Sequence, residues 1–416
     1  MNKTVAIIGS MDTKGEEYSF IKKHIEKTGL SAILIDTGVM GEPVVKPDIS
    51  RIQTAQAAGE DLDALKKNNP TREKIAPIMA EGAKNIVLKM IQENSIHGII
   101  SCGGTQGTTL ATYVMRALPV GFPKVMVSTM AAGNTANFVG IKDIVMIPSV
   151  ADIMGLNRIT RAILGEAAGA VSGMVLMETE QKTDDKKLIA ITTVGITTTG
   201  AMKAKEVFEE NGYDTIVFHA VGSGGNAMES LIKEGHIDAV FDLATIEVVQ
   251  QMLGGYLAAS PERMTVASEL GIPQVIAPGA VSCNTFGPPE TIPEKFRNRQ
   301  TVRHSSLFTN VRTNSDELRE LAAEQARRVN TAKGPIEWFI PLKGFCSYSV
   351  KDGPLYNPEA DKAYIETLKA SIRNDIPVHL INTDINDPEF VSEMAKRLIS
   401  MIEDSRKNDS EKNKKM

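Results

Sequence analysis

Two glycine-bearing stretches in the first half of the chain have residue types that suit phosphate binding. In the earlier one, Gly9–Glu17, the residues Thr13 and Glu16 have the spacing of a helix capping box. A helix that begins here would offer free N–H groups and a partial positive charge to a phosphate. Lys14 would add a cation, and Asp12 could hold Mg²⁺ or a ribose hydroxyl. An ordinary turn with a helix cap is the competing interpretation, because the G-x-x-x-x-G-K-[ST] motif is absent.

The second stretch, Gly103–Thr109, follows the apolar run 98–102 and reads G-G-T-Q-G-T-T. Its three glycines let the backbone approach a ligand closely, and its three threonine hydroxyls lie where a helix is expected to begin. This composition suits phosphate binding without a charged side chain. The stretch resembles the G-G-D-G-T loops of phosphofructokinase-like and NAD-kinase-like folds, with Thr105 in place of their metal-linked Asp. A tight turn with a threonine cap is the alternative.

Polar residues that follow two other expected strands could face the same cleft. Ser128 and Thr129 end one of these strands, and Asp36 and Thr37 end the other. An acidic residue in the place of Asp36 often contacts a ribose, although it also commonly caps a turn. The candidate residues of this first site are Ser10, Asp12, Thr13, Lys14, Asp36, Thr37, Gly103, Gly104, Thr105, Gln106, Gly107, Thr108, Thr109, Ser128 and Thr129.

A second group of candidates lies in the other half of the chain. The segment His219–Asn226 is another glycine-rich turn between an expected strand and an expected helix. Four arginines within 297–312 could clamp a carboxylate or a phosphate, although a solvated basic loop is the more common outcome. The residues that could contact a second ligand are His219, Gly222, Gly224, Gly225, Asp242, Asn284, Arg303 and His304.

Composition excludes several classes of protein. The chain has 416 residues and a formal charge of −5, so a basic nucleic-acid-binding face is not expected. The apolar runs are too short to cross a bilayer, and we expect neither membrane insertion nor secretion. Three cysteines suit a reducing cytoplasm. The histidines lack metal-ligand spacing, and no G-x-S-x-G motif occurs. Cys102 is a conceivable nucleophile, but a buried strand cysteine is usually a small apolar residue.

Short apolar runs alternate with helical periodicity along almost the whole chain. This alternation predicts an α/β fold with largely parallel sheets covered by helices on both faces. The expected strands of the first half are Val5–Ile8, Ala32–Ile35, Gly98–Cys102, Lys124–Ser128 and Ile144–Ile147. Those of the second half are Leu188–Thr192, Thr215–Phe218, Ala239–Asp242, Gln274–Ala277, Glu337–Pro341 and Val378–Ile381.

The pattern divides the chain into two similar doubly wound halves joined by a polar hinge at 180–187. We therefore expect an N-terminal domain at 1–183, a C-terminal domain at 184–403 and a cleft between them. Residues 404–416 predict a disordered charged tail. Residues 46–85 form an insertion, in which Pro70 and Pro77 are expected to break two helical stretches. This insertion could be a lid or a dimer contact.

Several long strings resemble the Tm-one-like ATP-binding family, and the resemblance runs from about residue 3 to residue 403. In the first half they are VAIIGSMDTKGEE (5–17), CGGTQGT (102–108), PKVMVST (123–129) and DIMGLNRI (152–159). In the second half they are FGPPETIPEKF (286–296) and DGPLYNPEAD (352–361). The sequence departs from the family at 131–134, which reads A-A-G-N in place of A-S-G-D, and at 282–287, which reads S-C-N-T-F-G in place of D-M-V-N-F-G. Each departure removes a carboxylate.

The resemblance implies two Rossmann-like domains, a cytoplasmic homodimer, and ATP bound with Mg²⁺ by the N-terminal half. In the plant member of the family this region precedes a TIM barrel that resembles phosphoenolpyruvate hydrolase. Here such a barrel would be a separate polypeptide partner. We therefore expect an ATP-binding protein. The alternatives are an enzyme that acts on a phosphorylated or sugar-acid molecule in the interdomain cleft, and a non-enzymatic, ATP-dependent protein-interaction module.

Overall fold

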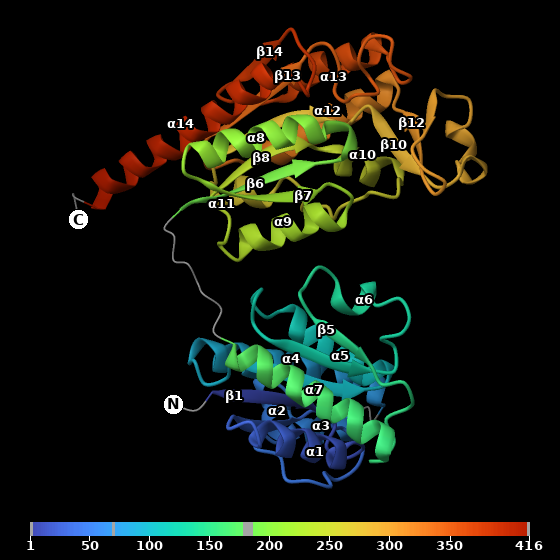
Figure 1. Cartoon of the computed structure of the whole chain (residues 1–416), viewed down its shortest axis with the longest axis vertical. Helices are drawn as coiled ribbons and strands as arrows, with labels where there is room; N and C mark the ends of the chain where they lie inside the picture. Colours follow the sequence, from blue (N-terminus) through green and yellow to red (C-terminus); the bar gives the residue numbers. More distant parts are fainter. Residues whose placement is uncertain (1–2, 69–70, 178–185, 414–416) are drawn as a thin grey trace. The chain divides into compact units, whose positions relative to one another are not determined.

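The computed structural model describes residues 3–68, 71–177 and 186–413. It divides the chain into two compact α/β units, Met1–Lys182 and Thr183–Met416 (Figure 1). The division falls within the polar hinge that the sequence analysis places at 180–187. The expected cleft between the domains stays a prediction.

The N-terminal domain is built on a parallel sheet of five strands in the order β2-β1-β3-β4-β5. Its strands are β1 (Thr4–Gly9), β2 (Ser31–Asp36), β3 (Gly98–Gly103), β4 (Lys124–Ser128) and β5 (Val145–Pro148). In register, Ile7 pairs with Leu34 of β2 on one side and with Ile100 of β3 on the other. The chain goes outward from β1 to β2 and then crosses back to β3. The strand order therefore reverses between β1 and β3.

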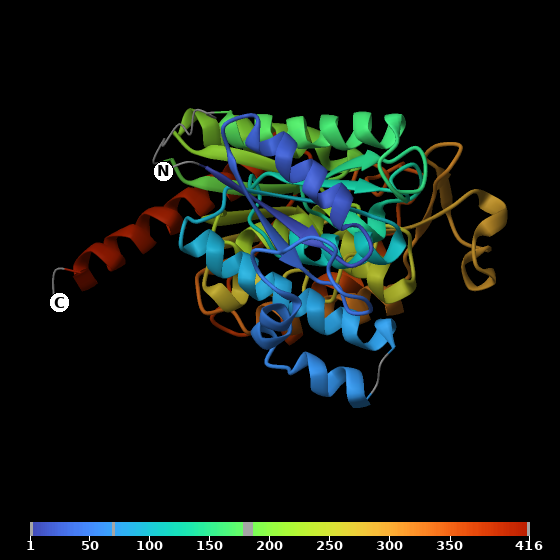
Figure 2. The same cartoon turned by 90° about the horizontal axis from the view of Figure 1, so that it is seen from below.

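Helices cover both faces of this sheet because successive strand residues point to opposite sides. Val5 and Ile7 pack with α1 (Gly15–Glu26) and α7 (Arg158–Leu176), whereas Ala6 and Ile8 pack with α4 (Arg72–Gln92) and α5 (Thr105–Arg116). Figure 2 shows α1 and α7 together on one side of the sheet. Helix α7 is long and apolar enough to cross a membrane. Its buried residues pack on the sheet, however, as expected for a core helix of a soluble domain.

The insertion at 46–85 forms α2 (Arg51–Ala57), α3 (Leu62–Asn68) and the first two thirds of α4. The prediction that Pro77 breaks a helix is wrong, because Pro77 lies inside α4. Proline removes only one hydrogen bond of the helix, and its fixed φ suits helical backbone. The buried stripe of Ile75, Met79 and Ala83 along α4 offsets this loss. Pro70 lies outside the described residues.

The C-terminal domain has a parallel sheet of six strands in the order β14-β13-β9-β8-β6-β7. Its strands are β6 (Leu188–Thr193), β7 (Asp214–His219), β8 (Ala239–Ala244), β9 (Gln274–Gly279), β13 (Ile336–Pro341) and β14 (Val378–Ile381). Taken in chain order, the first five of these strands have the same arrangement as the N-terminal sheet. The strand order again reverses beside the first strand, here between β6 and β8. This arrangement confirms the two doubly wound halves.

Two helical layers cover this second sheet. Ile189 and Ile191 pack with α8 (Thr198–Glu210) and α14 (Pro388–Asn413), while Ala190 and Val240 face α9 (Ser223–Lys233) and α11 (Val266–Leu270). Trp338 packs with α12 (Ser315–Val329) and α13 (Pro358–Ser371). Helix α14 continues through most of the segment that predicted a disordered tail. Its Glu, Lys and Arg residues are strong helix formers and prolong a helix that begins in the core.

A small antiparallel sheet in the C-terminal domain was not predicted. It contains β10 (Cys283–Phe286), β11 (Thr301–Arg303) and β12 (Thr309–Arg312), in the order β10-β12-β11. Strands of three or four residues are too short for an alternating pattern to be recognised, and several of their residues are polar. Helix α10 (Ile246–Leu253) packs against β10 and joins this sheet to the domain.

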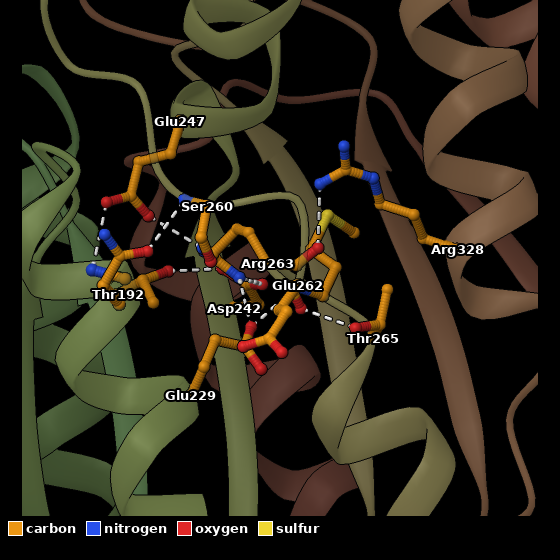
Figure 3. A network of polar contacts seen from close by, with 12 residues as sticks. Thr192, Glu229, Asp242, Glu247, Ser260, Glu262, Arg263, Thr265 and Arg328 are labelled. Atoms are coloured by element: carbon orange, nitrogen blue, oxygen red, sulfur yellow. Dashed lines mark hydrogen bonds and ion pairs between the residues drawn. The ribbon is translucent and has the colours of Figure 1, made fainter. Parts of the chain in front are cut away.

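A buried ion network connects β8, α9 and α10 of the C-terminal domain (Figure 3). Arg263 is fully buried and donates two hydrogen bonds of 2.7 Å to Asp242 and one of 2.7 Å to Glu247. Its guanidinium also lies 3.7 Å from Glu229. Burial raises the pKa of Glu229 to about 7 despite the nearby arginine. Three buried carboxyl groups thus depend on one guanidinium.

Replacing Arg263 with Met should destabilise the C-terminal domain by about 3–5 kcal/mol, because the carboxylates would stay buried without their cation. The measurement is urea unfolding followed by the fluorescence of Trp338, the single tryptophan, which lies in the core of this domain. Arg327→Met is the matched control, since Arg327 pairs with Glu324 at the surface and should contribute less than about 1 kcal/mol. Equal stability of the two variants would contradict a supporting role for Arg263.

Candidate functional site

A cavity of about 350 Å³ lies at the carboxyl ends of β1 and β3 in the N-terminal domain. The strand order reverses at this point, which is where open parallel sheets usually bind their ligands. Nine of the predicted residues line the cavity: Ser10, Thr13, Lys14, Thr37, Gly103, Gly104, Thr105, Gln106 and Gly107. The structure therefore brings the two glycine-bearing stretches together around one space.

The wall formed by Gly103–Gly107 carries the free N-terminus of α5. Gly104 is the N-cap residue, and no side chain caps the helix. Among the described residues, no acceptor bonds the N–H groups of Thr105, Gln106 and Gly107. A helix N-terminus without partners attracts anions because its N–H groups and its dipole both favour negative charge. The composition and geometry of the Gly103–Gly107 wall are thus suited to an anion.

Lys14 brings a positive charge to the lining of the cavity. Its ammonium group donates a hydrogen bond to the carbonyl of Ile153, which holds the side chain along the cavity. The predicted capping box of Thr13 and Glu16 is wrong, since α1 begins at Gly15 and Lys14 is its N-cap. The carbonyl of Ser10 accepts the N–H groups of Thr13 and Lys14, and this turn delays the start of the helix.

Asp12 and Asp36 do not line the cavity, and both are tied to Arg51. The Nε atom of Arg51 lies 2.7 Å from Asp36, and its Nη2 atom lies 3.7 Å from Asp12. Asp12 also accepts hydrogen bonds from the N–H groups of Met40 and Gly41. These contacts hold the loop after β2 against the loop after β1. Asp12 therefore has a structural partner in the place where the sequence analysis expected a metal or a ribose.

The other predicted threonines and serines lie behind or beside the Gly104 turn. Thr108 is buried and its hydroxyl lies 2.6 Å from the hydroxyl of Ser128, while the Thr109 hydroxyl bonds to the carbonyl of Thr105. Ser128 and Thr129 line a neighbouring hollow of about 440 Å³. Gly104, Thr105 and Asp152 border both this hollow and the cavity. The Gly104 turn is thus a shared wall.

Asp152 lines the cavity and was not among the residues predicted from the sequence, although its carboxylate could bind a cation. It is exposed and borders both spaces. Its string, 152–159, was noted only as a family motif. Within the described part of the chain, no group of three or more His, Cys, Asp or Glu side chains could hold a metal. A single carboxylate still suits Mg²⁺, because this ion is often held by one or two carboxylates together with phosphate oxygens.

Other cavity residues that were not predicted are Tyr18, Val39, Ala76, Ser101 and Leu110. Ala76 comes from α4, so the insertion contributes to the cavity wall. Cys102 also lines the cavity, and burial raises the pKa of its thiol to about 12. The thiol is therefore uncharged at neutral pH. This protonation state argues against Cys102 as a nucleophile, since the thiolate is the reactive form.

The residues predicted for a second ligand are dispersed in the C-terminal domain. His219 and His304 line one hollow of about 160 Å³. Gly222 and Gly225 instead donate their N–H groups to Glu247, over 2.6 and 3.0 Å. The remaining positions have other surroundings: Gly224 packs on the carbonyl of His219, Asp242 belongs to the Arg263 network, Asn284 is buried on β10, and Arg303 is exposed on β11.

The arginine cluster does not form a clamp. Arg312 is buried and pairs with Asp361, and Arg299 pairs with Glu317. Arg297 donates to the carbonyl of Ile292. Each of these three arginines binds a carboxylate or a carbonyl of a neighbouring segment of the chain. The cluster therefore supports the local structure around the small antiparallel sheet.

Replacing Asp12 with Asn should loosen the loop after β2 because the amide cannot give the charge-assisted hydrogen bonds of the carboxylate. We expect the amide protons of Met40 and Gly41 to exchange roughly tenfold faster, measured by hydrogen–deuterium exchange of the folded protein. Asp63→Asn, a change of the same kind at an exposed position of α3, should leave these amides unchanged. Unaltered exchange in both variants would show that Asp12 does not support the loop.

Comparison with known proteins identifies relatives across the whole chain. Residues 3–180 match the N-terminal domain of the uncharacterised protein family UPF0261, and residues 186–402 match its C-terminal domain. A UPF0261 protein of Clostridium tetani is 45% identical over 404 residues, which cover 97% of this chain and all of the relative. The MnaA protein of S. aureus, solved with UDP, has a TM-score of only 0.21 and 10% identity over 66% of this chain and 78% of its own.

Two tomato proteins are also similar. The ToMV resistance protein Tm-1(GCR237) is 31% identical over 423 residues, and the ToMV susceptible protein tm-1(GCR26) is 32% identical over 418 residues. These matches cover 97% and 95% of this chain but only 56% and 55% of the tomato proteins. The motifs had already indicated this relationship. The chain belongs to the UPF0261 family and is a homologue of the tomato Tm-1 proteins.

Proposed function

We propose that the N-terminal domain binds ATP with Mg²⁺, and that the N–H groups of Thr105, Gln106 and Gly107 hold its phosphates. The observation that carries this proposal is the free N-terminus of α5, which opens on a cavity bordered by a lysine. Backbone N–H groups, a helix dipole and one ammonium group form a site for a phosphate chain. The family resemblance supplies the choice of ATP among phosphorylated ligands.

A second glycine turn of the chain, which follows β7 in the C-terminal domain, provides a contrast. Its Gly222 and Gly225 donate to Glu247, so these N–H groups already have an internal anion. In the N-terminal domain, no carboxylate of the described residues bonds the Gly103–Gly107 turn. A turn that lacks an internal anion is available to an external one.

The remaining cavity walls suit a nucleoside. Val39, Ala76 and Leu110 provide apolar surface for a base, and the Thr37 hydroxyl is available to a ribose. Asp152 would hold the Mg²⁺, which would neutralise phosphate charge. A volume of about 350 Å³ lies within the usual range for ligand cavities.

Binding without turnover is favoured over catalysis. Among the described residues that line the cavity there is no imidazole, and Asp152 is the one carboxylate. The neutral thiol of Cys102 does not offer a nucleophile. An enzyme that acts on a phosphorylated or sugar-acid molecule is therefore the less favoured alternative. We propose instead that nucleotide binding orders this domain for an interaction with another protein.

The proposal predicts that Gly104→Val weakens ATP binding at least tenfold, about 1.4 kcal/mol, in calorimetric titration with Mg²⁺. The backbone of Gly104 suits any L-residue, and an added Cβ would meet nothing closer than the Thr129 hydroxyl at 3.8 Å. The variant should therefore fold, while its side chain blocks the phosphates. Gly169→Val, on the open surface of α7, is the control. Equal affinity of both variants would remove the turn from the site.

Lys14→Ala separates recognition of the phosphates from recognition of the nucleoside. We expect ATP affinity to fall roughly five- to tenfold, because the ammonium group contacts only the charged part of the ligand. Adenosine affinity should stay within about twofold, measured in the same titration. Equal losses for ATP and adenosine would mean that Lys14 supports the loop through its bond to Ile153.

A further inference from the structure

The C-terminal domain has its own hollow at the place that corresponds to the N-terminal cavity. It has a volume of about 160 Å³ and lies beyond the carboxyl ends of β6, β7 and β8. The strand order reverses between β6 and β8, so this is the expected ligand position of the second sheet. Residues of the small antiparallel sheet and the loop before β12 form one wall: Thr285, His304, Phe308 and Asn310.

A directional chain of hydrogen bonds fixes the amide of Asn310 in this wall. The backbone N–H of Thr285 donates to Gln250 Oε1 over 3.0 Å, and Gln250 Nε2 donates to the Thr285 hydroxyl over 3.3 Å. The hydroxyl then donates to Asn310 Oδ1 over 2.8 Å. The backbone donor fixes the orientation of the Gln250 amide, and the Thr285 hydroxyl accepts from it. The single proton of this hydroxyl is then used when Asn310 turns its oxygen, and not its nitrogen, toward Thr285.

This orientation makes Asn310 a donor to the hollow. Its side chain is nearly buried, with 6% exposure, and lines the space. Its oxygen is engaged by Thr285, and its Nδ2 atom has no acceptor among the described residues. An amide nitrogen held in this way offers hydrogen bonds to a ligand at little cost in conformational entropy.

The other polar groups around the hollow are also able to donate. His304 Nδ1 lies 3.2 Å from the Tyr348 hydroxyl, which leaves Nε2 for a ligand. His219 borders the same space from the end of β7, and Gly195 and Ile196 lie in the turn before α8. No carboxylate is found among the described residues that line the hollow. An excess of donors over acceptors favours an anion.

The size and the apolar surface of the hollow define the kind of anion. Val221, Ile246, Leu257 and Phe308 form the apolar part of the lining. About 160 Å³ is the liquid volume of roughly five water molecules, which suits an acid of a few carbon atoms. Glu247 already accepts the N–H groups of the neighbouring glycine turn, so these donors are not available to a phosphate group. A monoanion with a short aliphatic chain fits best.

We propose that this hollow binds a small aliphatic carboxylate, with the carboxylate group on Asn310, His219 and His304 and the aliphatic chain on the apolar residues. The site belongs entirely to the C-terminal domain. It does not rest on the nucleotide site, so either proposal can fail while the other holds.

The test uses butanoate as the probe and the full chain labelled with ¹³C in its histidine rings. The six histidines give six signals, and those of His219 and His304 are assigned with His219→Gln and His304→Gln. Addition of butanoate should shift both signals saturably at millimolar concentrations. The signals of His24, His97, His236 and His379 should stay in place. Butanamide, which has the same shape without the charge, should shift none.

Asn310→Asp should weaken the response at least tenfold, because a carboxylate then replaces the donor in the wall. Asn374→Asp, an exposed position of the same domain with the same change of charge, should respond as the natural protein does. Leu257→Trp, which fills the hollow from its rim, gives a second variant if Asn310→Asp does not fold. The proposal is overturned if the two signals do not shift, if either blocking variant responds normally, or if inorganic phosphate shifts them at lower concentration than butanoate.

Discussion

Every helix that follows a parallel strand in this fold begins with N–H groups that need an acceptor, and both domains depend on how this need is met. In the C-terminal domain, Glu247 accepts the N–H groups of Gly222 and Gly225, and Arg263 balances the charge that Glu247 brings into the interior. In the N-terminal domain, the helix after Gly104 has no such acceptor among the described residues. The N–H groups of the Gly222–Gly225 turn are bonded within the domain, whereas those of the Gly104 turn have no acceptor among the described residues.

A buried arginine between two acids supports the loops of each domain. Arg51 joins Asp12 and Asp36 beside the N-terminal cavity, as Arg263 joins Asp242 and Glu247 below the C-terminal hollow. Removing two acids and an arginine from water is costly unless each is paired. Such buried ion pairs therefore say little about ligand binding, but they explain how the neighbouring loops are positioned. They hold the backbone of the neighbouring loops in place.

Much of this architecture could be predicted from the sequence. The strands of both large sheets are apolar runs of four to six residues, and such runs are recognisable without a structure. Strands β10, β11 and β12 were missed because they are too short and too polar for a periodic pattern. The glycine and threonine residues around Gly104 could be recognised because glycine permits a close approach of the backbone and threonine is common where a helix begins. The role of Asp12 could not be predicted, since its partner Arg51 lies 39 positions away in sequence, from 12 to 51.

The Gly104 turn separates the cavity from the neighbouring hollow, and Gly104, Thr105 and Asp152 belong to both spaces. The donors of this turn are few, and each can satisfy only one anion at a time. Two ligands that enter from opposite sides would therefore compete for the same hydrogen bonds, even where their volumes do not overlap. A single elongated ligand would avoid this competition by extending across the turn. If each space binds a small ligand, the shared wall would make the two binding events negatively coupled.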